Sequence, residues 1–165
     1  MAEPAPPDWA AYTCEYLITH VLRRQHSEIR EELLRLSELV RTTAEPARAL
    51  ASLLTTMAAQ LTTHIAEEES MFPHLLELEL AYVGLDHASG APQRVCRGLD
   101  LASDQHRRHD QQLEELRAEA VRLGASDREL MGRLLRFHRA VVEHFQLEDR
   151  VLLPRAARME RELFS

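Results

Sequence analysis

Apolar residues recur every three or four positions over most of this chain, which is the period of a helix with one buried face. In the first quarter, this pattern predicts a helix with a cap at Asp8 or Thr13 and an end near Thr42 or Thr43. Its inward positions are Leu17, Leu22, Ile29, Leu33, Leu36 and Val40. Three prolines precede it, so we expect residues 1–8 to form a flexible arm.

A second helix begins at Pro46, a residue that fits the first helical turn, and runs to about Phe72. Pro73 follows and is expected to kink or end this helix, because proline lacks the N–H that continues the hydrogen-bond ladder. Glycines and prolines are scattered between Glu77 and Gln105, and they predict the one long connection of the chain.

The second half of the chain shows the same helical period twice more. A third helix is predicted from about Ser103 to Leu123, with Gly124 as its natural stop. A fourth is predicted from a cap at Ser126 or Asp127 to about Leu153, with a kink at Pro154. The alternation typical of strands is absent from the sequence. The predicted fold class is therefore all-α, with four helices.

The two halves of the chain repeat one another at an offset of 80 residues, so that His26 aligns with His106 and His64 with His144. Apolar positions align at the same offset, as do Glu68 and Glu148. Each half is then a helical hairpin, and two such hairpins make an up-down-up-down four-helix bundle.

Ionisable residues occupy the apolar face of the second helix. The stripe Leu54, Met57, Leu61 and Ile65 leads directly into His64 and Glu68. Residues four apart lie on the same side of a helix, so the imidazole and the carboxylate both point into the core. A buried charge without a partner is strongly unfavourable, so a compensating group is required.

The repeat supplies six such groups at the centre of the bundle. They are His26, His64, Glu68, His106, His144 and Glu148. Four neutral imidazoles and two carboxylates can hold two metal ions, because a carboxylate can bridge both ions, and this donor set suits Fe, Mn or Zn. Ferritin-like bundles use Glu-x-x-His instead. Leu61 and Val141 stand three residues before His64 and His144, which excludes that pattern.

The other histidines are weaker candidates. His109 occupies the repeat position of Ile29 and so faces partly inward, which leaves open whether it is a seventh ligand. His20 and His138 each precede a proposed ligand by six residues and therefore point about 120° away from it. His74 and His87 are expected at the surface or in a loop.

Length and composition limit the class of protein. With 165 residues and 45% apolar content, the chain is expected to form one domain over residues 9–165. The net charge is −7 and the basic residues form no cluster, which argues against nucleic acid and membrane surfaces as partners. No apolar run is long enough to span a membrane, and no signal peptide is apparent. We therefore expect a soluble, cytoplasmic protein.

His26, His64-x-x-x-Glu68, His106 and His144-x-x-x-Glu148 in four helices resemble the hemerythrin-like, HHE cation-binding family. The resemblance covers nearly the whole chain beyond residue 12. It implies a hemerythrin-like bundle whose core holds two iron ions as an oxo- and carboxylate-bridged, non-haem di-iron centre. The implied ligands are the same four histidines and two bridging glutamates.

Within that family, the amino-acid sequence is most similar to the hemerythrin domain of the repair-of-iron-centres proteins. The segments that carry this similarity are YLITHVLRRQHSEIREEL, HIAEEESMFP and EHFQLEDRVLLPRA. Oxygen-carrying hemerythrins have a second His four residues after the third-helix ligand. Asp110 stands there in this chain, which disfavours an oxygen carrier of that type.

The resemblance implies a protein that reacts with small oxidants such as dioxygen, peroxide or nitric oxide, in oxidative or nitrosative stress protection or in repair of iron centres. Whether it is an enzyme stays open. As an enzyme it would be a di-iron oxidoreductase that turns over peroxide or nitric oxide, or a ferroxidase. The alternatives are a non-enzymatic sensor or store of oxygen or iron, and a bundle with a purely structural metal. The sequence identifies no protein partner.

Overall fold

The computed structural model describes residues 8–42, 48–84, 92–122 and 128–164, and all regular structure within these ranges is helical. The all-α prediction is therefore confirmed for the described residues. The helices, in chain order, are η1 (Trp9–Ala11), α1 (Cys14–His20), η2 (Val21–Gln25), α2 (His26–Thr42), α3 (Arg48–Tyr82), α4 (Pro92–Arg122), α5 (Arg128–Leu147), η4 (Glu148–Leu152) and α6 (Leu153–Phe164). None of these helices is long and apolar enough to cross a membrane.

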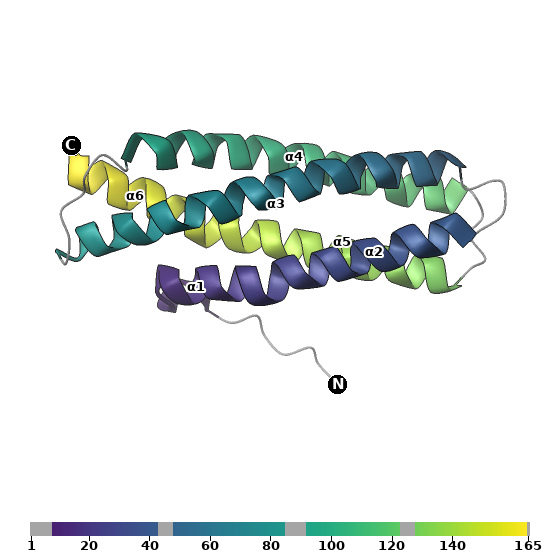
Figure 1. The fold of residues 1–165 in the computed structure, drawn as a ribbon, viewed down its shortest axis with the longest axis horizontal. Helices are drawn as coiled ribbons and strands as arrows, with labels where there is room; N and C mark the ends of the chain where they lie inside the picture. The colour runs from purple at the N-terminus through teal and green to yellow at the C-terminus, as the bar shows by residue number, and fades with distance from the viewer. Residues whose placement is uncertain (1–7, 43–47, 85–91, 123–127, 165) are drawn as a thin grey trace.

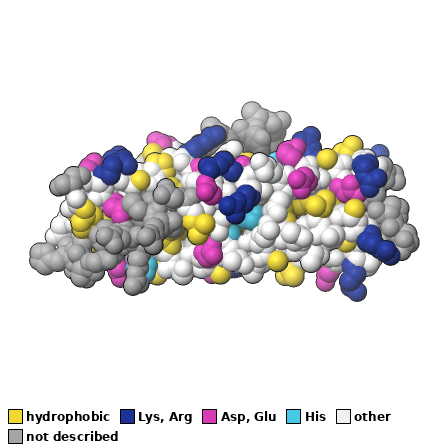
Figure 2. Space-filling model, turned by 90° about the horizontal axis from the view of Figure 1, so that it is seen from above, with side chains coloured by type: hydrophobic (Ala, Val, Ile, Leu, Met, Phe, Trp, Pro, Cys, Tyr) yellow, Lys and Arg dark blue, Asp and Glu magenta, His cyan; other side chains and the backbone are white. Residues whose placement is uncertain are grey.

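The helices form a bundle of four long courses that lie side by side along one axis (Figure 1). The first course joins α1, η2 and α2, and the last joins α5, η4 and α6, while α3 and α4 are each a single long helix. On the face drawn in Figure 2, arginine and acidic side chains are interspersed, without a patch of one sign over its described part.

Both predicted caps at the N-terminus are present. The side chain of Asp8 accepts a hydrogen bond from the amide of Ala10 at the 3₁₀ turn η1, and Thr13 accepts one from the amide of Tyr16 at the start of α1. The rest of the predicted arm lies outside the described residues. The same holds for Pro46, Gly124, Ser126 and Asp127, so the predictions made for them remain predictions.

The predicted long connection is wrong in its bounds. The helix α3 continues through Pro73 to Tyr82, and α4 begins at Pro92 instead of Ser103. A proline inside a helix costs about 3 kcal/mol. Burial of an apolar side chain contributes about 1.5–3 kcal/mol each, and beyond the proline α3 buries Leu75 and Leu78, both 1% exposed. This burial outweighs the proline. Gly84 follows the helix with a φ of 76° and accounts for its end.

Two π-helical turns interrupt the outer courses, η2 just before His26 and η4 beginning at Glu148. A π turn accommodates one extra residue in a helix. The repeat shows where the residue was added, because Pro73 is five positions after Glu68 whereas Pro154 is six positions after Glu148. The wider turn η4 accommodates the extra residue. The chain then continues directly into α6, which contains Pro154, so the helix does not end at this proline.

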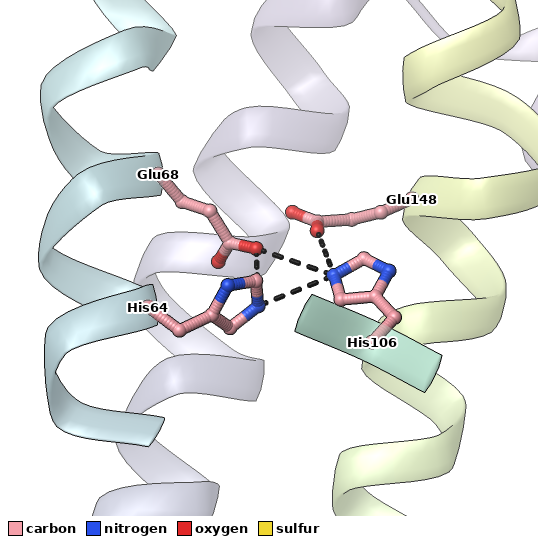
Figure 3. Close-up of side chains that lie close together, drawn as sticks. All are labelled: His64, Glu68, His106 and Glu148. Carbon is pink, nitrogen blue, oxygen red and sulfur yellow. Dashed lines mark hydrogen bonds and ion pairs between the residues drawn. The ribbon is translucent and has the colours of Figure 1, made fainter. Parts of the chain in front are cut away.

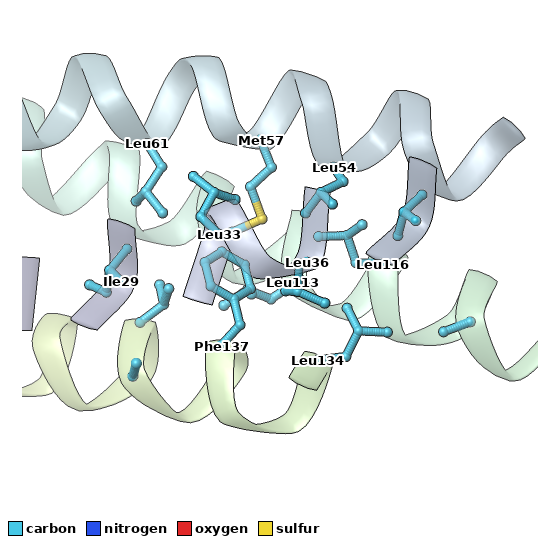
Figure 4. Packing of buried hydrophobic residues seen from close by; sticks show 14 of the residues in the cluster. Ile29, Leu33, Leu36, Leu54, Met57, Leu61, Leu113, Leu116, Leu134 and Phe137 are labelled. Atoms are coloured by element: carbon cyan, nitrogen blue, oxygen red, sulfur yellow. The ribbon is translucent and has the colours of Figure 1, made fainter. Parts of the chain in front are cut away.

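The apolar core is divided into two clusters with the polar centre between them. The first apolar cluster comes from α2, α3, α4 and α5 and includes Ile29, Met57, Leu116 and Phe137 (Figure 4). The second comes mainly from α1, the end of α3, η4 and α6, and includes Leu17, Phe72, Leu75, Leu147 and Met159. Along α3, Glu68 lies between Ile65 of the first cluster and Phe72 of the second, so apolar packing closes the centre from both ends of the bundle.

Candidate metal centre

Every course of the bundle contributes to one buried group of imidazoles and carboxylates. The first course supplies His26, α3 supplies His64 and Glu68, α4 supplies His106, and the last supplies His144 and Glu148. Each of these six side chains is at most 2% exposed. The structure thus brings together all six residues that the sequence predicted, and their role as ligands remains a prediction.

One set of donors consists of His64, Glu68, His106 and Glu148, whose ligand atoms lie within 4.8 Å of one another (Figure 3). Nε2 of His64 lies 2.6 Å from Oε1 of Glu68 and 3.2 Å from Nε2 of His106. Nε2 of His106 lies 3.3 Å from Oε2 of Glu148. Ligands held at about 2.0–2.2 Å from one ion lie no more than about 4.4 Å apart, and these contacts fall within that limit.

A second set consists of His26, Glu68 and His144. Oε2 of Glu68 lies 3.2 Å from Nε2 of His26 and 3.3 Å from Nε2 of His144. The two oxygens of the Glu68 carboxylate therefore face different sets of imidazoles. A carboxylate in this position could bridge two ions.

Hydrogen bonds outside the centre fix the orientation of three imidazoles. Nδ1–H of His26 donates to Glu69 at 3.0 Å, and Nδ1–H of His106 donates to Asp149 at 2.9 Å. Nδ1–H of His64 donates to the amide oxygen of Gln105 at 2.8 Å. A neutral imidazole that donates through Nδ1 presents the lone pair of Nε2. In their neutral form, these three imidazoles therefore direct their Nε2 lone pairs into the centre.

The fourth imidazole lacks such a partner. Nδ1 of His144 is buried without a hydrogen-bond partner in the protein, and so is the side-chain oxygen of Gln25. The repeat relates these two residues to His64 and Gln105, which do form a hydrogen bond. Gln25 lies in the π turn η2, which has no counterpart in α4. Of the four rings, that of His144 is thus the least restrained.

Three residues that orient the imidazoles from outside the centre were not predicted from the sequence: Glu69, Gln105 and Asp149. The repeat nevertheless contains a signal for two of them. At the same offset of 80 residues, Glu69 aligns with Asp149, and both accept from the Nδ1–H of a candidate ligand. An acid directly after the glutamate of each His-x-x-x-Glu is therefore part of the repeated pattern.

The surroundings of the two carboxyl groups shift their pKa values in opposite directions. Burial alone raises the pKa of Glu68, but the imidazoles of His144, His106 and His26 hold it well below its usual range. Burial and the nearby charge of Glu68 raise the pKa of Glu148 to about 7. Burial lowers the pKa of His106, whereas its contacts with Asp149, Glu148 and Glu68 raise it to about 11. Glu68 is therefore the stronger anion of the pair.

The donor set fits a bound cation. Nε2 of His26, Nε2 of His144, Oε2 of Glu68 and both oxygens of Glu148 are buried without a hydrogen-bond partner in the protein. Buried polar atoms are normally paired, and each one left unpaired costs about 1–3 kcal/mol. In addition, the Nε2 atoms of His64 and His106 face each other. Lone pairs and anionic oxygens that converge in this way are stabilised by positive charge placed among them.

Aromatic rings cover the imidazoles on the apolar sides. Phe145 stacks on His106 with ring centroids 4.1 Å apart, and Phe72 stacks on His26 at 6.1 Å. Both phenylalanines are 3% exposed. They keep bulk water away from the centre, where a low local dielectric strengthens the interaction of a cation with its ligands.

His109 is buried but belongs to neither set of donors. Its Nδ1 contacts the amide oxygen of Gln112 at 3.1 Å, and its ring lies 5.4 Å from that of His64. Burial lowers its pKa below the ordinary value for histidine. The position of His109 beside the centre agrees with the partly inward direction expected from the sequence.

The remaining described histidines lie away from the centre. His20 packs on Trp9 with ring centroids 4.7 Å apart, and His138 lies 3.6 Å from Glu114. His74 is partly exposed and lies 3.4 Å from Glu77. His87 falls outside the described residues.

Comparison with protein families gives one match. Residues 17–93 match the family model of the hemerythrin HHE cation-binding domain. This segment is a little under half of the chain and contains three of the six candidate ligands, His26, His64 and Glu68. Comparisons with curated proteins and with solved structures gave no match. The family match covers the domain in general, so the closer similarity to the repair-of-iron-centres proteins stays a prediction. Residues 17–93 are thus similar to a cation-binding domain, and the buried His and Glu side chains form groups that could hold a metal ion.

Proposed function

We propose that this chain is a non-haem di-iron protein of the cytoplasm that reacts with small oxidants such as dioxygen, peroxide or nitric oxide. In this proposal the bundle has the up-down-up-down topology of hemerythrin-like proteins. Its biological role is protection from oxidative or nitrosative stress, or repair of iron centres. The observation that carries the proposal is the carboxylate of Glu68, whose two oxygens face separate sets of imidazoles.

In this proposal, the six residues of the centre hold two ions. His64, His106 and Glu148 would hold one ion, His26 and His144 the other, and Glu68 would bridge them. Glu69, Gln105 and Asp149 keep three Nε2 lone pairs directed inward. Iron bound there would supply the electron transfer that reduction of small oxidants requires.

Incomplete coordination by the protein supports reactivity over a purely structural role. A structural metal site is usually closed by protein ligands, whereas a reactive site keeps an open position. The set around His26, Glu68 and His144 offers three donor residues, fewer than the four of its neighbour. This favours a small molecule as the additional ligand of the second ion.

The test is anaerobic reconstitution with ferrous iron, followed by separate exposure to dioxygen, peroxide and nitric oxide. We expect more than one equivalent of at least one oxidant to be consumed per centre when reductant is supplied. A reversible spectral change without turnover would identify a sensor or carrier. A natively purified protein that holds zinc and does not respond to oxidants would contradict the proposal.

A further inference from the structure

A cavity of about 330 Å³ between α3 and α4 reaches the candidate metal centre. Its lining includes the exposed side chain of Glu67 and the buried carboxylate of Glu68. Met71 and His74 continue the lining along α3, and Ala102 and Gln105 line it from α4. The cavity therefore connects solvent to the one residue that belongs to both donor sets.

Glu68 is the most deeply buried residue of the lining, and its side chain is 2% exposed. Its Oε2 has no hydrogen-bond partner in the protein and faces Nε2 of His26 and of His144. At the outer end, the amide of Gln105 donates to Oε2 of Glu67 at 2.7 Å and accepts from Nδ1–H of His64 at 2.8 Å. One side chain thus connects the carboxylate at the mouth to an imidazole of the centre.

The repeat shows that this face differs from its counterpart. Leu147 occupies the position that corresponds to Glu67, is 2% exposed and belongs to the second apolar cluster. The opposite side of the centre is therefore closed by an apolar side chain where this side carries a carboxylate. Glu69, the other acidic neighbour of Glu68, already contacts His26 and Arg30. Among these three consecutive acids, Glu67 is the one at the mouth of the cavity.

We propose that this cavity is the route by which a divalent metal ion reaches the centre. Glu67 and His74 bind the ion at the mouth, and Glu68 receives it inside. The inference rests on the proposed function, because it assumes that the centre binds metal. Carboxylate oxygens and an imidazole attract a divalent cation and disfavour an anion, so the lining selects the charge of the ion that enters.

The test is the rate of metal uptake by the metal-free protein, followed in a stopped-flow instrument by the visible absorption of cobalt(II) as the metal alone. Glu67→Gln removes the charge at the mouth and keeps the shape of the side chain. We expect it to slow uptake about five- to tenfold at low salt, with a smaller difference at high salt. The final metal content should equal that of the wild type.

Two further variants make the result specific. Ala102→Leu narrows the cavity without changing its charge, and we expect slower uptake at every salt concentration. Glu143→Gln is the matched control, because Glu143 is exposed and precedes His144 as Glu67 precedes Glu68, yet does not line the cavity. It should leave the rate unchanged. Circular dichroism of each variant verifies that the bundle is folded.

The outcomes separate this inference from the function on which it rests. Wild-type uptake rates in both Glu67→Gln and Ala102→Leu, with full metal content, would overturn the route and leave the di-metal centre in place. Equal slowing by Glu143→Gln would overturn it too, because the effect would then come from overall charge. A wild-type chain that binds no metal would overturn the proposed function and the route together.

Discussion

Oε1 of Glu68 lies 2.6 Å from Nε2 of His64, one helical turn earlier on α3, which is the shortest of the contacts described between a carboxylate and an imidazole of the centre. The other oxygen of the same carboxylate faces His26 and His144. Glu148 reaches only the imidazoles of His106 and His144, at 3.3 and 4.0 Å. The two glutamates that the repeat aligns are therefore not equivalent in the folded chain.

This difference predicts unequal effects of removing each carboxylate. Glu68→Gln should abolish tight binding of both ions, because both donor sets lose their shared anionic ligand. Glu148→Gln should remove at most one ion, since Glu148 belongs to one set. Metal analysis after desalting measures both, with Glu143→Gln, at an exposed residue outside both donor sets, as the control that keeps its metals. Loss of both ions in Glu148→Gln with retention in Glu68→Gln would contradict the assignment of the bridge.

His106 and His109 are expected to differ in the same assay. His106 faces the centre through Nε2, whereas His109 lies in neither donor set. Three residues along a helix correspond to a rise of about 4.5 Å, so the two imidazoles lie at different levels of the bundle. His106→Ala should lose at least one ion per chain, and His109→Ala should keep two. The reverse result would show that the ligand assigned to α4 is wrong.

Removal of metal should destabilise the fold. A ligand that binds only the native state adds about 4 kcal/mol at a thousandfold excess over its dissociation constant. For a chain of this length, that corresponds to a fall in Tm of about 8–16 °C. Differential scanning calorimetry with and without a chelator measures it, and metal analysis verifies the removal. An unchanged Tm after complete removal would count against a centre built around bound ions.

The metal-free protein should become less stable as pH rises. Between about pH 4.5 and 7, Glu148 retains a proton in the folded state that it loses in the unfolded state. His106 does the same between 6.5 and about 11. Stability falls with pH wherever the native state binds more protons. The low pKa of Glu68 acts in the opposite direction, but only in stronger acid. Burial lowers the pKa of His20 and of His109, which opposes the trend below their ordinary value of 6.5. Urea unfolding of the metal-free protein from about pH 7 to about pH 9 therefore tests the prediction, and a midpoint that rises with pH in this range would refute it.

The ligand set was predictable because it depends on side-chain direction and on the repeat. His64 and Glu68 continue an apolar stripe, and the offset of 80 residues places His144 and Glu148 in the same register. These two signals do not depend on where each helix begins or ends. Consequently, the six residues converge in the structure although the third helix begins eleven residues earlier than predicted, at Pro92 instead of Ser103.

The errors arose where local propensity competes with packing. Pro73 is compatible with α3 because the residues beyond it bury large apolar side chains in the second apolar cluster. Gly98 is tolerated inside α4, because glycine disfavours a helix by only about 1 kcal/mol. The π turn η4 reflects a one-residue difference between the halves, which the gap-free alignment does not include. The same alignment pairs Glu69 with Asp149, but their hydrogen bonds to the imidazoles can be recognised only from the side-chain contacts.

The most direct test of the central claim is an equilibrium titration of the metal-free wild-type chain with ferrous iron under anaerobic conditions, with iron per chain determined at saturation. Two donor sets that share Glu68 predict saturation at two ions per chain. Saturation at a single ion would contradict the shared carboxylate as a bridge and would reduce the centre to a mononuclear site.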